Sequence, residues 1–122
     1  MSRQQSGFTL IELIIVVIIF GLLAIVSVPK FINLEVAAKT AAINSVAASL
    51  SASNAVNYVS RKASLTKGIP ILNCMDVGST LEGGLPTNYA IISTATMEDT
   101  NTMCTLTGPS AITATFMATG IA

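Results

Sequence analysis

Few side chains in this sequence could do chemistry, and the most conspicuous is a carboxylate in an apolar segment. Glu12 stands directly before the uncharged run of residues 13–28, and a charge buried at the centre of a bilayer would cost about 2 to 3 kcal/mol. The 122 residues contain no histidine and only two cysteines, Cys74 and Cys104. This excludes histidine-based general acid–base catalysis and zinc sites that need histidine or several cysteines. The composition therefore argues against an enzyme.

The charge balance argues against nucleic acid as the main partner. Six basic and six acidic side chains cancel to a formal net charge of zero, whereas phosphate neutralisation needs a basic surface. Hydrophobic residues make up 52% of the chain and charged residues only 10%. That excess indicates a membrane segment attached to one small domain.

The apolar segment that starts at Phe8 is long enough to cross a membrane. Its 21 residues, 8–28, are interrupted near the start by Thr9 and Glu12, and a helix of that length spans about 31 Å. A secretory signal peptide is the alternative. Its basic start would be weak here, its apolar stretch too long, and the cleavage site around Ser27 poor.

The charge of Glu12 needs compensation. In the first turn of a helix, backbone N–H groups and the positive end of the helix dipole favour an anion. A cut between Gly7 and Phe8 would supply a better partner, because the new amine of Phe8 would lie near Glu12 in the same chain or in a neighbour. The alternative is a glutamate whose side chain reaches the lipid headgroups by snorkelling.

The sequence GFTLIEL at residues 7–13, followed by the uncharged run and Pro29, resembles the class III signal of type IV prepilins and pseudopilins. The resemblance implies that residues 1–7 are a leader, which prepilin peptidase removes after Gly7 on the cytoplasmic side before methylating the amine of Phe8. It also implies that Glu12 pairs with a Phe8 amine during subunit addition. Residues 29–34, 55–58 and 84–86 resemble the mannose-sensitive haemagglutinin group of type IVa-like pilins, with leucine where that group has an aromatic residue in a Gly-aromatic-Pro turn.

Residues 8–29 are expected to form a membrane and polymerisation helix, and residues 30–61 its amphipathic continuation. Apolar side chains recur at helical spacing in the second part: Val36, Ile43, Val46, Ala47 and Leu50. Gly21 and Pro29 weaken the backbone between the parts, because glycine adds conformational entropy and proline lacks an N–H donor. By resemblance to assembled pili, we expect the helix to loosen between these two residues in a filament.

Residues 62–122 are expected to form a small antiparallel β-sheet head on the amphipathic half-helix, which makes the fold α+β. Glycine and proline turns separate short apolar runs, and strands are expected at residues 89–96, 103–106 and 111–118. One face of the last strand carries its apolar side chains: Ile112, Ala114, Phe116 and Ala118.

A head of this size needs a covalent staple. A bridge between Cys74 and Cys104 would close a loop of about 30 residues and contribute roughly 3 to 4 kcal/mol in the chain-entropy model. An export-type helix places the head outside the cytoplasm, where disulfides persist. Two reduced, buried thiols are the alternative.

The charged side chains of the head fit solvated turns better than a ligand site, so no metal or cofactor is expected. The acidic candidates for calcium are Asp76, Glu82, Glu98 and Asp99. Their spacing matches no EF-hand, and residues 98–102 fit a polar turn. The basic residues near the predicted helix end are Arg61, Lys62 and Lys67. Without interleaved aromatic residues they fit a solvated helix end better than a phosphate site.

The leading interpretation is a structural subunit that polymerises through its amino-terminal helix into a type IV pilus. The resemblance implies an inner-membrane stage with the head in the periplasm, followed by an extracellular fibre for adhesion, motility or biofilm formation. It implies as partners other pilin subunits, prepilin peptidase, a membrane platform with its assembly ATPase, and membrane lipid before assembly. A pseudopilin of a type II secretion system is the alternative, and an anchored binding module such as a tip adhesin is a third interpretation.

Overall fold

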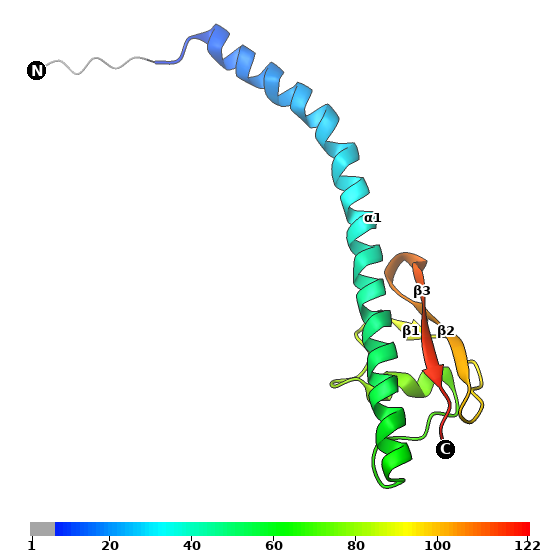
Figure 1. The fold of residues 1–122 in the computed structure, drawn as a ribbon. Helices are drawn as coiled ribbons and strands as arrows, with labels where there is room; N and C mark the ends of the chain where they lie inside the picture. The colour runs from blue at the N-terminus through cyan, green and yellow to red at the C-terminus, as the bar shows by residue number, and fades with distance from the viewer. Residues whose placement is uncertain (1–6) are drawn as a thin grey trace, which may run out of the picture. The chain divides into compact units, whose positions relative to one another are not determined.

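The structure, a computed structural model, describes residues 7–122, so the leader expected at residues 1–7 lies outside the described residues except for Gly7. One long helix, α1 (Leu10–Ala63), is followed by short elements (Figure 1). These are the 3-10 helix η1 (Cys74–Thr80), strands β1 (Ala90–Ile91) and β2 (Asn101–Thr107), the 3-10 turn η2 (Pro109–Ala111) and strand β3 (Thr113–Thr119). The chain divides into two compact units, one ending at Ala37 and the other spanning Ala38–Ala122, and α1 contributes to both.

The first unit consists of the amino-terminal part of α1. This part is rich in leucine, isoleucine and valine, and each of its large apolar side chains from Phe8 to Val36 is at least 45% exposed. A helix that is apolar all round and left exposed by the described residues needs an apolar environment supplied from outside.

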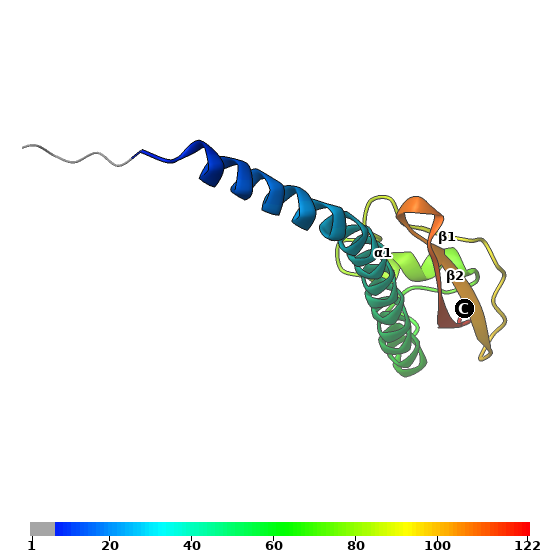
Figure 2. The same ribbon diagram turned by 90° about the horizontal axis from the view of Figure 1, so that it is seen from above.

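The second unit is an antiparallel sheet packed on the carboxy-terminal half of α1. The strand order is β1-β2-β3. β2 and β3 pair along their whole length, from Asn101 opposite Thr119 to Thr107 opposite Thr113, whereas β1 adds only two residues beside the end of β2. Figure 2 shows the sheet and η1 on one side of this half of the helix. The α+β prediction is therefore confirmed.

The strand expected at residues 89–96 is wrong except at Ala90–Ile91, which form β1. Only β1 pairs with β2, and the backbone then turns toward the segment around the start of η1. Cys74 N donates to Thr94 O at 2.8 Å, and Thr96 N donates to Leu72 O at 3.0 Å. The Thr- and Ile-rich pattern predicted extended backbone correctly, but the hydrogen-bond partners are loop residues instead of a neighbouring strand.

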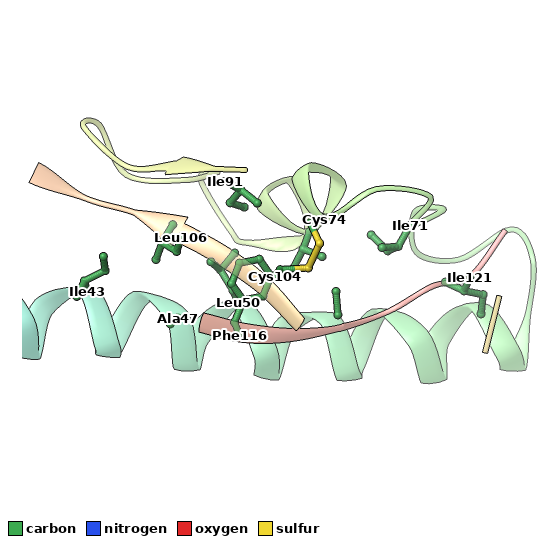
Figure 3. Close-up of a cluster of buried hydrophobic side chains, with 12 residues drawn as sticks. Ile43, Ala47, Leu50, Ile71, Cys74, Ile91, Cys104, Leu106, Phe116 and Ile121 are labelled. Carbon is green, nitrogen blue, oxygen red and sulfur yellow. A yellow bond between two sulfur atoms is a disulfide. The ribbon is translucent and has the colours of Figure 1, made fainter. Parts of the chain in front are cut away.

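The hydrophobic core lies between α1 and the sheet (Figure 3). From α1, Ile43, Ala47 and Leu50 each expose 4% of their surface or less. Their spacing of four and three residues places them on one helical face. The sheet contributes Ile91, Cys104, Leu106, Phe116 and Ala118, all buried. The alternation predicted for the last strand is thus confirmed at Phe116 and Ala118, with Ile112 and Ala114 partly buried beside them.

The buried face of α1 begins later than expected. Val46 packs against the core, as predicted, but Val36 is 57% exposed. Val36 belongs to the first unit, whereas Ile43 lies within the second, where the sheet covers the helix. The predicted apolar face therefore starts earlier along the helix than the face that is buried.

A disulfide joins Cys74 of η1 to Cys104 of β2, as predicted, with a Cα–Cα distance of 5.8 Å. Both residues are fully buried. Asn73 caps η1 by accepting a hydrogen bond from Met75 N, and Asp76 bonds back to Asn73 N at 2.9 Å. The sequence alone did not indicate this short helix, which the disulfide fastens to the sheet.

Asn57 fastens the loop after α1 to the helix. Its Nδ2 donates to Ile69 O and its Oδ1 accepts from Ile69 N, both at 2.8 Å. Gly68 has a φ of 70°, and a Cβ on it would meet Asn57 Oδ1 at 2.7 Å. Glycine is required here both by backbone conformation and by space.

The turn between β2 and β3 holds two non-glycine residues in the left-handed region. Ser110 has a φ of 62° and Ala111 a φ of 58°, a conformation that costs roughly 1 to 2 kcal/mol per L-residue. Lys39 Nζ donates a hydrogen bond of 3.1 Å to Ser110 Oγ. Because these turn residues are not extended, β3 begins at Thr113 and not at residue 111 as expected.

Ala111→Gly is expected to stabilise the head by about 0.5 to 1 kcal/mol. Glycine relieves the left-handed strain of roughly 1 to 2 kcal/mol, and this exceeds the 0.4 to 1 kcal/mol or so that its added freedom in the unfolded chain costs. Urea unfolding of the full chain in detergent measures the effect. Ala52→Gly, on the exposed side of α1, is the control and should lower stability by about 1 kcal/mol. A lower unfolding midpoint for Ala111→Gly would contradict the strained turn.

Candidate functional site

The amino terminus of α1 is closed by two reciprocal hydrogen bonds. Thr9 N donates to Glu12 Oε2 at 3.0 Å, and Glu12 N donates to Thr9 Oγ1 at 3.3 Å. This is a capping box, which gives partners to two N–H groups that a helix start otherwise leaves unpaired. Thr9 was not among the residues expected to matter, although Thr-x-x-Glu before an apolar run is the signature of this cap.

The capping box gives the Glu12 carboxylate a partner within its own chain. In the described chain Phe8 N belongs to a peptide bond and carries no charge, so the carboxylate relies on backbone N–H groups and on the helix dipole. An ion pair between Glu12 and the amine of Phe8 needs prior cleavage, and it stays a prediction.

The junction between Gly7 and Phe8 lies just before the helix and is accessible. Phe8 is 93% exposed, and a Cβ on Gly7 would meet no atom within 4 Å. Phe8 and Leu13 flank the cap at the positions of a hydrophobic staple, and together with Glu12 they line a shallow apolar groove. Within the described residues, no packed side chain shields this peptide bond from a protease.

Among the described residues, α1 is the one helix that is long and apolar enough to cross a membrane. Its most apolar 18-residue window has a mean hydropathy of 3.1, and none of it is buried in the chain. The hydroxyl of Ser27 is satisfied internally, because its Oγ donates to Leu23 O at 2.7 Å. This removes one polar group that lipid would otherwise have to accommodate.

Gly21 and Pro29 both lie inside α1, which is continuous through them in the single chain. The proposed loosening concerns the helix after assembly, so it stays a prediction for the filament.

A second polar cluster lies at the carboxyl end of α1, far along the chain from Glu12. Asp99 Oδ1 accepts a hydrogen bond of 2.9 Å from Tyr58 OH and forms an ion pair with Lys62. The hydrogen bond from Lys62, followed by that from Tyr58, holds the pKa of Asp99 below its ordinary value. The same hydrogen bonds to Asp99 raise the pKa of Lys62 and of Tyr58. The cluster ties the loop after β1 to the end of α1.

Asp99→Asn is expected to remove a pH-dependent part of the head's stability. Because the folded pKa of Asp99 is lowered, its contribution is complete above the unfolded pKa near 3.9 and is lost as pH falls through the folded value. Because the pKa of Lys62 and of Tyr58 is raised, their contribution is complete below about pH 10 and is lost as pH rises through their folded values. Asparagine suits the φ of 54° at this position.

This cluster is tested by measuring the melting temperatures of wild type and of Asp99→Asn from pH 2 to pH 11. The quantity of interest is the difference between the two melting temperatures at each pH. The difference should be largest between about pH 4 and pH 10 and should shrink at both ends. It should be small, because both side chains of the ion pair are about half exposed. A difference that is constant over the whole range would contradict the assignment.

Most other charged candidates of the head are used to hold the chain together. Arg61 Nε donates to Ala122 O at 3.0 Å, and Glu98 Oε2 accepts from Ala122 N at 2.9 Å. Asp76 bonds to the backbone before η1. Across residues 7–122, no three histidine, cysteine, aspartate or glutamate residues come together as a metal-binding group.

Two comparisons with known proteins bear on this amino-terminal site. Residues 2–28 match the family described as "Prokaryotic N-terminal methylation motif", which includes the Gly7–Phe8 junction and Glu12. Over 81 residues the chain is 38% identical to the type IV narrow pilus major component PilA5 of Thermus thermophilus. The chain is thus similar, over part of its length, to a type IV pilus component. The aligned part covers 66% of this chain and 64% of the relative, so the chain spans less than two thirds of that protein's length. No solved structure matches at a significant level.

The residues expected to be functional are divided between the two compact units. Gly7, Phe8 and Glu12 lie together at the start of α1, where Thr9 joins them through the cap. The disulfide lies in the head, which belongs to the other compact unit. The sequence motif therefore indicates the amino-terminal site most clearly, because the residues of that site are neighbours in the chain.

Proposed function

We propose that this pilin-like chain is a structural subunit of a type IV pilus, cleaved after Gly7 and methylated on the new amine of Phe8 by prepilin peptidase. One observation carries the proposal: an exposed apolar helix holds Glu12 in the capping box of its first turn, just after an accessible Gly7–Phe8 junction. The methylation motif and the similarity to a pilus major component support it.

The exposed first unit makes physical sense if it has two successive environments. Before assembly its apolar side chains lie in lipid, and after assembly they pack against the helices of neighbouring subunits. Lipid provides little hydrophobic drive for helices to associate. Packing, and the ion pair between Glu12 and a Phe8 amine, must therefore favour the fibre. Loosening of α1 between Gly21 and Pro29 would let the helix adapt to that packing.

The same proposal defines location and partners. The subunit first spans the inner membrane once, with residues 62–122 in the periplasm, where the Cys74–Cys104 disulfide persists. It then becomes part of an extracellular fibre of identical or homologous subunits. A membrane platform and its ATPase supply the work of extrusion, and the subunit itself acts structurally.

Among pilins, we place the chain beside the mannose-sensitive haemagglutinin group, on the basis of residues 29–34 and 55–58. Residues Gly84–Pro86 of this chain would then correspond to the Gly-aromatic-Pro turn of that group. Adhesion, twitching motility and biofilm formation are then properties of the whole fibre. A fibre made mainly of this subunit distinguishes it from an anchored tip adhesin, which would be rare in sheared fibres.

Deletion of the gene tests the proposal against the alternative of a type II secretion pseudopilin. Electron microscopy should show that surface fibres are lost, while an assay of culture supernatants should show unchanged secretion of folded proteins. Restoring the gene should restore the fibres. Loss of secretion with fibres intact would support the pseudopilin and contradict the pilus subunit.

A further inference from the structure

Two charges bound the uncharged part of the first unit. After Glu12, the next charged residue is Lys30, 18 positions further along α1. At 1.5 Å per residue they are separated by about 27 Å along the helix, close to the roughly 30 Å of a bilayer's hydrocarbon core. With Glu12 at one headgroup layer, the long side chain of Lys30 reaches the other.

Lys30 has no acidic partner on its own helix. The positions three and four residues away, where a carboxylate could pair with it, are Val26, Ser27, Asn33 and Leu34. The described residues give its ammonium group neither an ion pair nor a hydrogen bond. An anion that pairs with Lys30 would therefore have to come from outside the described residues.

The backbone beside Lys30 also indicates a membrane boundary. Pro29 has no N–H group, so the carbonyl of Ile25 lacks the hydrogen bond that the helix would give it. An unpaired carbonyl is costly in hydrocarbon but not where water reaches the headgroups. The unpaired charge and the unpaired carbonyl thus favour the same depth.

The surface next to Lys30 has a shape and chemistry that suit a phospholipid. A shallow hollow of about 240 Å³ lies along the helix. Its lining is formed by Val26, Ser27, Lys30, Phe31 and Leu34. Because the Ser27 hydroxyl already donates to Leu23 O, the rest of the lining is mostly apolar. An acyl chain could lie along the hollow while the ammonium group meets a phosphate.

We propose that Lys30 binds the phosphate of a phospholipid headgroup in the leaflet on the side of the head, and so fixes the depth of the subunit before assembly. The proposal rests on the membrane stage of the proposed function. It gives Lys30 a defined role in extraction, because the lipid contact must break when the subunit leaves the bilayer for the fibre.

The absence of tryptophan from the chain permits a direct test of insertion depth. Phe31→Trp places a single fluorescent reporter next to Lys30 in the full chain, reconstituted in phosphatidylethanolamine and phosphatidylglycerol vesicles. Lipids brominated at different acyl positions quench the reporter according to its depth. We expect the strongest quenching from bromines nearest the headgroup.

Adding Lys30→Gln should move the reporter toward the bilayer centre. The limit is about 7.5 Å, the rise between Lys30 and Glu35, which would become the next charge to stop at the interface. Lys30→Arg should keep the reporter at its original depth. Lys67→Gln, which removes an exposed cation of the head, is the matched control and should change nothing.

Vesicles of phosphate-free galactolipid identify the ligand. If lipid phosphate binds Lys30, the Phe31→Trp reporter should sink in these vesicles as it does with Lys30→Gln, and added inorganic phosphate should not restore its depth. Equal depth for Lys30 and Lys30→Gln in phospholipid would overturn the Lys30 proposal while leaving membrane insertion intact. A reporter that no brominated lipid quenches would show that the chain does not insert, and would overturn the membrane stage of the proposed function as well.

Discussion

Glu12→Val is expected to abolish or severely reduce fibre growth while leaving the subunit in the membrane. Valine removes a charge that would cost about 2 to 3 kcal/mol at the centre of a bilayer, so insertion should be unchanged or improved. It also removes the carboxylate that would meet the amine of Phe8 when subunits stack. Electron microscopy of sheared fibres, together with immunoblots of the membrane fraction, measures both effects. Fibres of normal length and number would show that Glu12 has no role in assembly.

Two further variants separate the charge of Glu12 from its role in the capping box. Glu12→Gln keeps a side-chain oxygen that can accept from Thr9 N but cannot form an ion pair. Thr9→Val removes the hydroxyl that accepts from Glu12 N and leaves the charge in place, at a cost of about 0.5 to 2 kcal/mol to the helix start. If the charge drives assembly, Glu12→Gln should resemble Glu12→Val, and Thr9→Val should have the milder effect. The opposite order would assign the function of Glu12 to the cap.

Removing the disulfide should have the largest effect on the stability of the head. The bridge between Cys74 and Cys104 closes a loop with a sequence separation of 30, which corresponds to roughly 3 to 4 kcal/mol in the chain-entropy model. A head of this size has little stability to spare. The double variant Cys74→Ala, Cys104→Ala should therefore unfold at much lower urea concentration than wild type.

Wild-type protein treated with a thiol reductant is the matched control for the alanine variant. It loses the covalent bond but keeps both sulfur atoms, so it separates the bridge from the small cavities that alanine leaves in the core. Both samples should lose most of the same stability. A loss below about 1 kcal/mol in the reduced protein would contradict a stapling role for the bridge, since the chain-entropy term for a loop of this length is several times larger.

The parts of the fold that the sequence predicted are those that depend on regular spacing. The helical period of Ile43, Ala47 and Leu50 predicted their common buried face, and alternation predicted the inward side of β3 at Phe116 and Ala118. The disulfide followed from compartment and cysteine number, without knowledge of its geometry.

The features that the sequence did not predict depend on contacts between distant segments. The backbone at residues 94–96 bonds to residues 72–74 and not to a neighbouring strand, and no local sequence pattern predicts those partners. The same holds for Asp99, whose partners Tyr58 and Lys62 lie some 40 residues earlier. Thr9 is different, because its capping signal is local and could have been found from its spacing to Glu12.

The mature amino terminus of the fibre subunit tests the central claim most directly. Fibres sheared from cells that carry this gene are purified, and their main component is sequenced by mass spectrometry. The proposed function predicts a chain that begins at Phe8 with a methyl group on its amine, the group that would meet Glu12 in the fibre. A main component of this sequence that begins at any other residue, or with an unmodified Phe8, would contradict it.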